Sequence, residues 1–248
     1  MRDENGVLLQ GGFSCPLFEP GTAGVIGSET ITLPKIEKPR KLIFQIALDG
    51  TEISNSYECW LFPEREKKAL SHFVVSESII NHFRQFYRDV RPYGDPSMTP
   101  DDILIARPDD PIVADAEKEG RSLFIITYAS PDPDVRLGWW ALGTQVGTAF
   151  ADSPAWGDFP LDPWMNALWF RMIRKGAFDL REAPPIAGLR PLAVGEGRDS
   201  YYLYLGESFE NNRHVLISFA LDVFKGTPEA NYLLDSLLTY LLETKLVK

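Results

Sequence analysis

Three tryptophans are the residues best suited to contact a ligand. Trp139, Trp140 and Trp156 lie in an irregular stretch, residues 130–163, that is rich in proline and glycine. Aromatic faces on such a stretch can stack on sugar rings, which makes these side chains candidate carbohydrate contacts. Aromatic side chains also contribute strongly to core packing, so the alternative is that the three pack beneath the stretch. The sequence leaves both interpretations open.

The other reactive side chains form neither a catalytic nor a metal-binding pattern. His72 and His82 are ten residues apart, a spacing that does not place them on one helical face, and His214 is remote from both. A serine or cysteine nucleophile needs a sharp strand–turn–helix with small neighbours, which neither Cys59 nor Ser153 has. Glycoside hydrolysis needs two facing carboxylates, and no such pair is marked. We therefore predict no catalytic residue and no metal ligand in this chain.

Cofactor signatures are also missing. The segment Gly-Glu-Gly at 195–197 lacks the third glycine of a dinucleotide fingerprint, and no Gly-Lys-Ser/Thr follows Gly21 and Gly24 as a phosphate loop requires. No cofactor is therefore expected. The two cysteines, Cys15 and Cys59, have no partner at metal-ligand spacing. Buried free thiols are expected for both, with a bridge between them as the alternative.

Charge and hydropathy argue against two classes of partner. The chain has 25 basic and 35 acidic residues, a net charge of −10, whereas binding to nucleic acid phosphates needs a basic patch. No apolar run reaches the roughly 18 residues that span a bilayer. Neither nucleic acid nor a membrane is expected as a partner. The first residues are polar and unlike a signal peptide, and the compartment is not readable.

Residues 7–63 have a β pattern. The clearest strand is expected at residues 41–48, followed by the turn dipeptide Asp49-Gly50 and a strand at about 52–62. Alternation predicts another strand at 25–34, and residues 6–13 predict a short one. An immunoglobulin-like sandwich has about seven strands. These roughly four strands therefore predict an incomplete sandwich, its back half.

From about residue 70 the pattern changes to strands that alternate with helices. A strand is expected at 72–75, then a helix capped by Ser76 or Ser78. A buried strand at 102–106, a helix at 110–119 and a second buried strand at 122–127 follow. Strand, helix and strand within about 30 residues form a βαβ unit with parallel strands. The boundary between the two halves is expected at residues 63–70.

The last third of the chain predicts two more helices and three more strands. A helix is expected at 164–173, and strands are expected at 189–194, 201–205 and 215–219, the last two joined as a hairpin. The final helix should be capped by Thr227, with Pro228 in its first turn. Apolar residues then recur at helical spacing, at Ala230, Leu233, Leu234, Leu237, Leu238 and Leu241.

Several short motifs, in this order, resemble the C-terminal region of bacterial family 2-type glycoside hydrolases, the β-galactosidase-like proteins with a sugar-binding domain label. In that family an immunoglobulin-like domain ends in Asn-Ser-Trp-x-x-Trp-Val-Phe-Pro, and residues 55–63 read Asn-Ser-Tyr-Glu-Cys-Trp-Leu-Phe-Pro. The residues at 143–147 (Gly-Thr-Gln-Val-Gly), the pair Phe159-Pro160, and Trp164 and Trp169 are similar to later hallmarks. The resemblance covers roughly residues 6–243.

The resemblance implies an α/β plus all-β fold. Residues 1–65 would be the partial immunoglobulin-like β-domain, and residues 66–248 an α/β domain of flavodoxin or class I amidotransferase-like fold. In the family the catalytic glutamates lie on a (β/α)8 barrel that precedes this region, and the Asn-Glu pair that marks the acid/base does not occur here. A barrel needs about 250 residues of its own.

The implied function is therefore that of a non-catalytic C-terminal accessory portion of a β-galactosidase-like glycoside hydrolase, with a structural or substrate-shaping role in carbohydrate degradation. The implied partners are the catalytic barrel or other parts of the same enzyme, and carbohydrate. The alternative is an independent carbohydrate-binding protein that uses the loop tryptophans.

Overall fold

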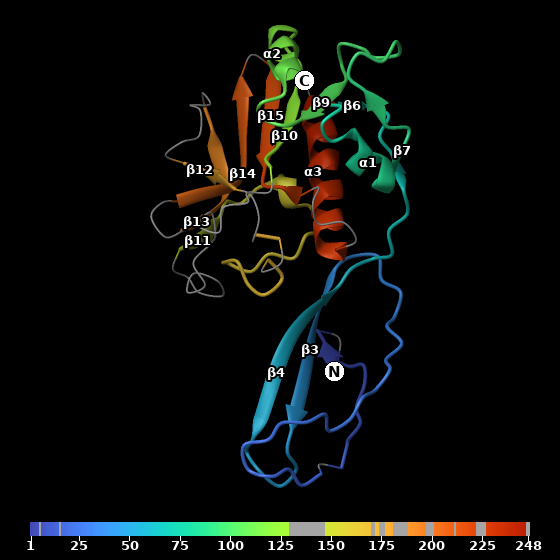
Figure 1. The fold of residues 1–248 in the computed structure, drawn as a ribbon, viewed down its shortest axis with the longest axis vertical. Helices are drawn as coiled ribbons and strands as arrows, with labels where there is room; N and C mark the ends of the chain where they lie inside the picture. The colour runs from blue at the N-terminus through green and yellow to red at the C-terminus, as the bar shows by residue number, and fades with distance from the viewer. Residues whose placement is uncertain are drawn as a thin grey trace. The chain divides into compact units, whose positions relative to one another are not determined.

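A computed structural model describes residues 1–4, 6–14, 16–128, 147–169, 172–173, 177–180, 188–196, 201–210, 212–221 and 227–246. Helices and strands are mixed within these residues, and most elements are strands. The chain divides into two compact units, Met1–Glu64 and Arg65–Lys248 (Figure 1). The sequence places this division between residues 65 and 66, one residue further along.

The first unit contains one antiparallel sheet with the strand order β2-β1-β3-β4. Its strands are β1 (Arg2–Asp3), β2 (Gly6–Val7), β3 (Arg40–Ala47) and β4 (Ser54–Leu61). β3 and β4 form the predicted hairpin (Figure 1). At its turn the Leu48 amide donates to the Ile53 carbonyl at 3.0 Å. Gly50 has a φ of +73° there, a conformation that glycine adopts without steric cost.

Three expectations for the first unit are wrong. Residues 25–34 form no strand and are mostly exposed, and the strand expected at 6–13 covers only Gly6–Val7. Alternation is not sufficient for a strand, because its backbone groups also need a neighbouring strand. Cys59 is an exposed free thiol, since it lies on β4 at the edge of the sheet, where residues 54–59 are all exposed. Cys15 lies outside the described residues.

The second unit is built on one large mixed sheet with helices packed against it. Its elements are β5 (Lys68–Ala69), β6 (Phe73–Val75), α1 (Ile80–Phe86), β7 (Tyr87–Arg88), β8 (Arg91–Pro92), β9 (Ile103–Ala106), α2 (Pro111–Lys118), β10 (Leu123–Ile126), β11 (Thr148–Phe150), η1 (Pro154–Trp156), β12 (Phe178–Asp179), β13 (Arg190–Glu196), β14 (Tyr201–Glu210), β15 (Arg213–Ser218) and α3 (Pro228–Leu246). β5 and β7 pair with each other in a separate two-stranded sheet.

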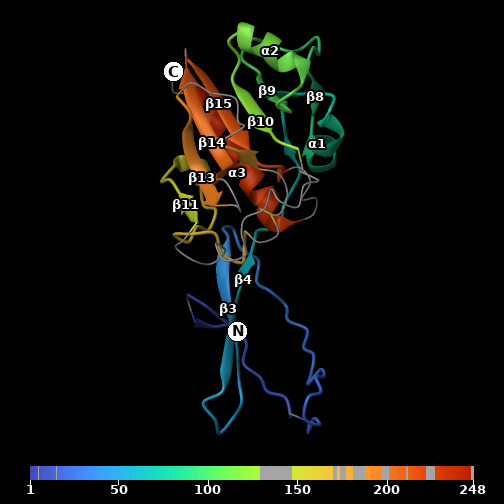
Figure 2. The same cartoon turned by 60° about the vertical axis from the view of Figure 1, so that its left-hand side comes forward.

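One half of the large sheet is parallel and the other half is antiparallel. β8, β6, β9, β10 and β15 are neighbours in that order and run parallel to one another. β14, β13 and β11 continue the sheet from β15 in antiparallel fashion (Figures 1 and 2). The βαβ unit β9-α2-β10 and the hairpin of β14 with β15 are as predicted. All residues of β9 and β10 are buried, which explains their continuous apolar sequences.

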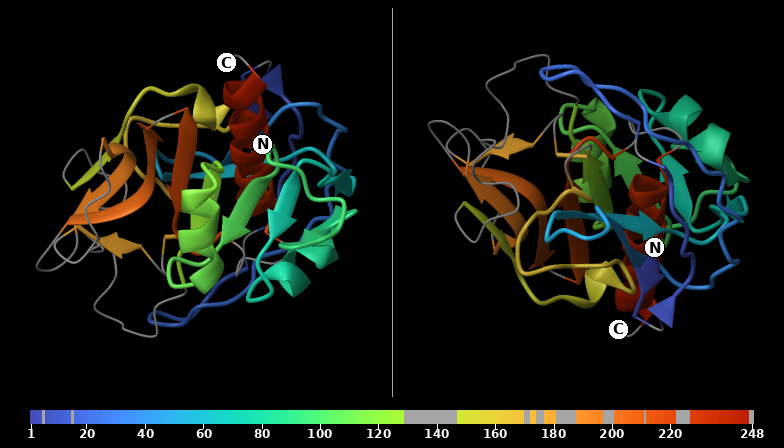
Figure 3. Two further views of the ribbon diagram at one scale, coloured as in Figure 1. Left: turned by 90° about the horizontal axis from the view of Figure 1, so that it is seen from above. Right: turned by 90° about the horizontal axis from the view of Figure 1, so that it is seen from below.

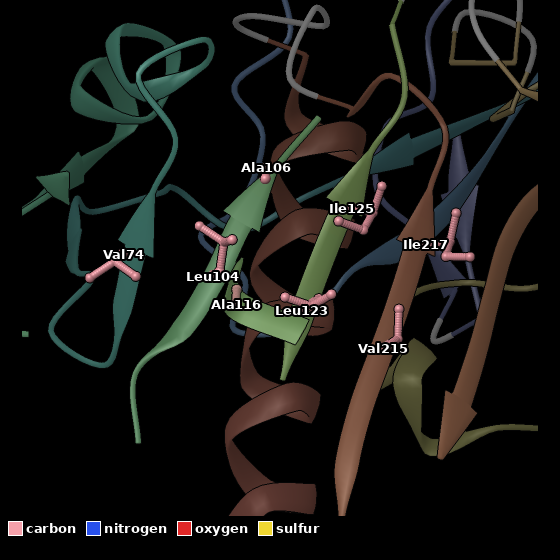
Figure 4. Packing of buried hydrophobic residues seen from close by; sticks show 8 residues of the cluster. All are labelled: Val74, Leu104, Ala106, Ala116, Leu123, Ile125, Val215 and Ile217. Carbon is pink, nitrogen blue, oxygen red and sulfur yellow. The ribbon is translucent and has the colours of Figure 1, made fainter. Parts of the chain in front are cut away.

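Helices α2 and α3 cover opposite faces of the parallel strands (Figure 3). Val74, Leu104, Leu123 and Val215 lie on the face against which Ala116 of α2 packs. Figure 4 shows these side chains on one side of the sheet with α3 passing behind the other. Successive strand residues point to opposite faces, so the strands contribute to a core on each side.

The apolar stripe of α3 is buried as predicted. Its buried members are Ala230, Leu233, Leu234, Leu237, Leu238 and Leu241. At its start the Thr227 carbonyl accepts the Asn231 amide at 3.1 Å. Asp235, on a more polar side of the helix, binds Arg65 Nη2 at 2.9 Å and accepts from Tyr87 Oη at 2.5 Å. No described helix is long and apolar enough to cross a membrane.

Two helix predictions for the second unit are wrong in detail. Residues 164–169 and 172–173 form bends and turns rather than a helix. Asn166 contributes to this, because its side-chain oxygen accepts the Leu168 amide at 2.9 Å, a local bond that competes with helical pairing. The N-cap of α1 is Ile79, without a side-chain cap bond. Ser76 instead supplies its carbonyl to the amides of Ile79 and Ile80.

Candidate functional site at the carboxyl edge of the parallel strands

Three neighbouring parallel strands end at the same edge of the sheet, and a polar residue follows each of them. Ser76 follows β6, Arg107 follows β9 and Thr127 follows β10. The Ser76 amide donates to the Ile105 carbonyl of β9 at 2.8 Å. This bond continues the ladder to the ends of the strands and holds the first two polar residues side by side.

Asp110, at the start of α2, ties the loop after β6 to the loop after β9. Its Oδ2 atom accepts from Ser78 Oγ at 2.8 Å and from the Arg107 amide at 2.8 Å. Ser78 Oγ lies 3.1 Å from Ser76 Oγ. A hydrogen-bonded path therefore runs from the end of β6 to the beginning of α2. Seven residues near these strand ends form what we call the carboxyl-edge cluster: Ser76, Glu77, Ser78, Arg107, Asp109, Asp110 and Tyr128.

Arg107 connects this path to β10 and to an aromatic ring. Its side chain is directed at the strand ends, where Nη1 donates to the carbonyls of Ile126 at 3.2 Å and Thr127 at 2.5 Å. Its guanidinium carbon lies 4.9 Å from the centre of the Tyr128 ring, within range of a cation–π interaction. Arg107 is 5% exposed, whereas Tyr128 is 47% exposed. A hydrogen bond to Asp109 raises the pKa of the Tyr128 hydroxyl above its usual 10.0.

The groups of this cluster are suited to binding a polar ligand. It contains hydroxyls, carboxylates, a guanidinium and a phenol ring, and none of its members is a histidine or cysteine. The Ser78 hydroxyl donates to a carboxylate that also accepts a backbone amide, an arrangement that positions loops. Within the part of the chain that the structure describes, no group of three His, Cys, Asp or Glu residues could hold a metal ion.

The tryptophans selected from the sequence are not part of this cluster. Trp156 lies in η1 and is 4% exposed, and its Nε1 donates to the Ala151 carbonyl at 2.9 Å. Its ring meets those of Phe150 and Trp169 edge to face, with centroids 5.5 and 6.1 Å away. The faces of Trp156 are therefore covered by protein in this structure and do not present a surface to a sugar. Trp139 and Trp140 lie outside the described residues.

A second polar cluster is buried between β14, β15 and α3. Glu207 accepts from Tyr240 Oη at 2.8 Å, from His214 Nε2 at 3.2 Å and from Arg190 Nη1 at 3.1 Å. His214 Nδ1 lies 2.9 Å from Thr244 Oγ1. Glu207 is 0% exposed and His214 is 2% exposed. Because Glu207, His214 and Tyr240 bind one another away from solvent, we interpret this cluster as structural.

Sequence reasoning identified only two members of the carboxyl-edge cluster, Ser76 and Ser78, and only as helix caps. A signal for the others exists in the sequence. Arg107 directly follows one buried apolar run, and Tyr128 comes two residues after another. Because parallel strands end at one edge of a sheet, polar residues at these positions meet in space.

Comparison with models of protein families gives a match. A family model described as a domain of unknown function, DUF8488, matches residues 1–63, which corresponds to the first unit, Met1–Glu64. No curated protein matches the chain.

Proposed function

We propose that this chain is a non-catalytic accessory portion of a β-galactosidase-like glycoside hydrolase, with a structural or substrate-shaping role in carbohydrate degradation. The observation that carries the proposal is the order of its parts. The run at 55–63, which resembles the end of the family's immunoglobulin-like domain, covers most of β4, the last strand of the first unit. A separate α/β unit follows it directly, as in that family.

The strand order supports a flavodoxin or amidotransferase-like fold for the second unit. We number the five parallel strands along the chain, so that β6 is 1, β8 is 2, β9 is 3, β10 is 4 and β15 is 5. Across the sheet they lie in the order 2-1-3-4-5, which is the order of flavodoxin-like sheets. For the first unit we propose the back half of an immunoglobulin-like sandwich. Its four strands form one sheet, and a complete sandwich consists of two packed sheets.

Packing around the family hallmarks also supports the proposal. Phe159 and Trp169 meet edge to face with centroids 5.4 Å apart, and Trp169 also contacts Phe150 and Phe219. These hallmark aromatics therefore have a structural role in the second unit. The hallmark glycine and glutamine at 143–146 lie outside the described residues. The partner that this proposal requires is the catalytic barrel or another part of the same enzyme.

We expect the purified chain to hydrolyse no nitrophenyl glycoside. The chain has no Asn-Glu pair, and Glu207, the one fully buried carboxylate among the described residues, is engaged by three side chains. The assay should cover β-galactoside, β-glucoside and β-glucuronide substrates. Turnover that follows the protein peak through two chromatographic steps would contradict the proposal. A coding sequence for a barrel in frame upstream of Met1 would support it directly.

A further inference from the structure

We propose that the carboxyl-edge cluster is a carbohydrate-binding site in which the ring of Tyr128 is the stacking platform. The choice of ligand class rests on the proposed role in carbohydrate degradation. The inference differs from the sequence hypothesis of loop tryptophans, because it places the contact on the ends of the parallel strands.

The cluster lies where the strand order of the sheet reverses. β8 follows β6 in the chain but lies on the side of β6 away from β9, so the strand order reverses at β6. In open α/β sheets, ligands bind outside the carboxyl ends of the strands at such a reversal point. Ser76 and Ser78 follow β6, and Arg107, Asp109 and Asp110 follow β9. The cluster therefore occupies the two sides of the reversal.

Tyr128 is held in place by a neighbouring side chain of the cluster. The Arg107 guanidinium carbon lies 4.9 Å from the centre of its ring. Arg107 is in turn fixed by the carbonyls of Ile126 and Thr127. A ring that is 47% exposed yet held against a fixed guanidinium loses less conformational freedom on binding than a free side chain would, and such preorganisation increases affinity.

The charges and hydrogen-bonding groups of the cluster determine which kind of ligand it fits. Glu77, Ser78 and Asp109 are exposed, and ionised carboxylates accept hydrogen bonds from sugar hydroxyls. Arg107 is the basic member of the cluster, and its Nη1 atom already binds two carbonyls. An anionic ligand would meet the charges of Glu77 and Asp109. The site therefore fits a neutral saccharide better than a phosphate.

The test is a calorimetric titration of the full chain with lactose, cellobiose and a β-galacto-oligosaccharide, with inorganic phosphate as the anionic probe. We expect saturable binding of at least one saccharide and none of phosphate. Tyr128→Ala should weaken saccharide binding about tenfold, since an aromatic contact contributes up to about 1.5 kcal/mol beyond its buried area. Tyr128→Phe keeps the ring and should retain most of the affinity.

The matched control is Tyr201→Ala. Tyr201 is 57% exposed, begins β14 and is not a member of the cluster, so its removal should leave binding unchanged. Thermal melting of each variant shows whether the fold is kept. Failure of every saccharide to bind, equal affinity in Tyr128→Ala and the original chain, or binding of phosphate in place of saccharide would each overturn the proposal. Glycoside turnover by the chain would instead overturn the accessory role and leave this site untouched.

Discussion

Deletion of residues 227–248 is expected to leave the second unit unfolded or aggregated. α3 buries five leucines, and burying one leucine side chain contributes roughly 1.5–3 kcal/mol. Together they represent on the order of 10 kcal/mol before entropy is subtracted, comparable with the net stability of a whole domain, about 5–15 kcal/mol. The deletion also removes Tyr240 and Thr244 from the buried polar cluster. Gel filtration and circular-dichroism melting measure the outcome.

A single substitution in α3 tests the same packing with a smaller loss of stability. Leu237 is 0% exposed, and Leu237→Ala should lower the free energy of unfolding by about 2–5 kcal/mol because it leaves a cavity in the core. Thr239→Ala, at an exposed position of the same helix, is the control and should change it by less than about 0.5 kcal/mol. Urea unfolding followed by tryptophan fluorescence compares the two. A deletion variant that stays soluble and melts as cooperatively as the full chain would contradict the assigned role of α3.

The longer elements were predictable because local sequence and tertiary packing favour the same structure. The apolar runs of β9 and β10 enclose a helix that begins with Pro111 and ends before Gly120, which has a φ of +72°. Pro fits the first turn of a helix and Gly its end, so the βαβ unit follows from about 25 residues. α3 was predictable for a similar reason, since its leucines recur at helical spacing.

The short elements were not predictable, because pairing with distant residues creates them. β8 contains two residues, Arg91 and Pro92, and exists through its register with Val74 and Val75. β11 likewise forms by pairing with β13 more than 40 residues away. The opposite error occurs at residues 25–34. The alternating pattern there predicts a strand, but no neighbouring strand pairs with it. Strand propensity describes how well a segment suits a pleated sheet. Whether the segment joins a sheet depends on the whole fold.

The candidate site can be located only from the sequence together with the order of the strands in the sheet. The residues Ser76, Arg107 and Tyr128 are spread over about 50 positions of the sequence. Arg107 and Tyr128 each come just after an apolar run, but these runs alone do not show which strands are neighbours. Once β6, β9 and β10 are known to be parallel neighbours, their following residues must share one edge. Exposure then separates the two aromatic candidates, since Tyr128 is 47% exposed and Trp156 is 4% exposed.

The second large effect is expected at Glu207. Glu207→Ala would leave the Tyr240 hydroxyl and the His214 ring without their shared carboxylate in the core. Each buried group left unsatisfied costs about 1–3 kcal/mol, so the free energy of unfolding should fall by about 2–6 kcal/mol. Glu207→Gln keeps the shape and one acceptor oxygen, and should cost less. The two variants separate the loss of hydrogen bonds and volume from the loss of charge.

The charge of Glu207 also predicts a pH dependence. Burial acts to raise the pKa of Glu207, but hydrogen bonds from His214 and Tyr240 and the charge of Arg190 hold it below its usual 4.5. Because this pKa is lower in the folded state than in the unfolded state, the ionised carboxylate stabilises the fold above about pH 4.5. That contribution is lost as the pH falls through the folded-state pKa. The difference in unfolding free energy between the original chain and Glu207→Gln should therefore be largest at neutral pH and should shrink below about pH 4.5.

Tyr240 makes the corresponding prediction at alkaline pH. Burial, together with its hydrogen bond to Glu207 and the charge of Glu207, raises the pKa of Tyr240 from 10.0 to about 12. A raised pKa contributes stability that is complete below the unfolded value of 10.0 and is lost as the pH rises through about 12. In Glu207→Gln this alkaline loss should be smaller and should end at a lower pH, because the carboxylate no longer opposes ionisation of the phenol in the folded state. Urea unfolding at a series of pH values measures the loss of stability at acid pH and the loss at alkaline pH. A difference between the two proteins that stays constant from neutral to acid pH would show that the Glu207 carboxylate is not stabilised by the fold.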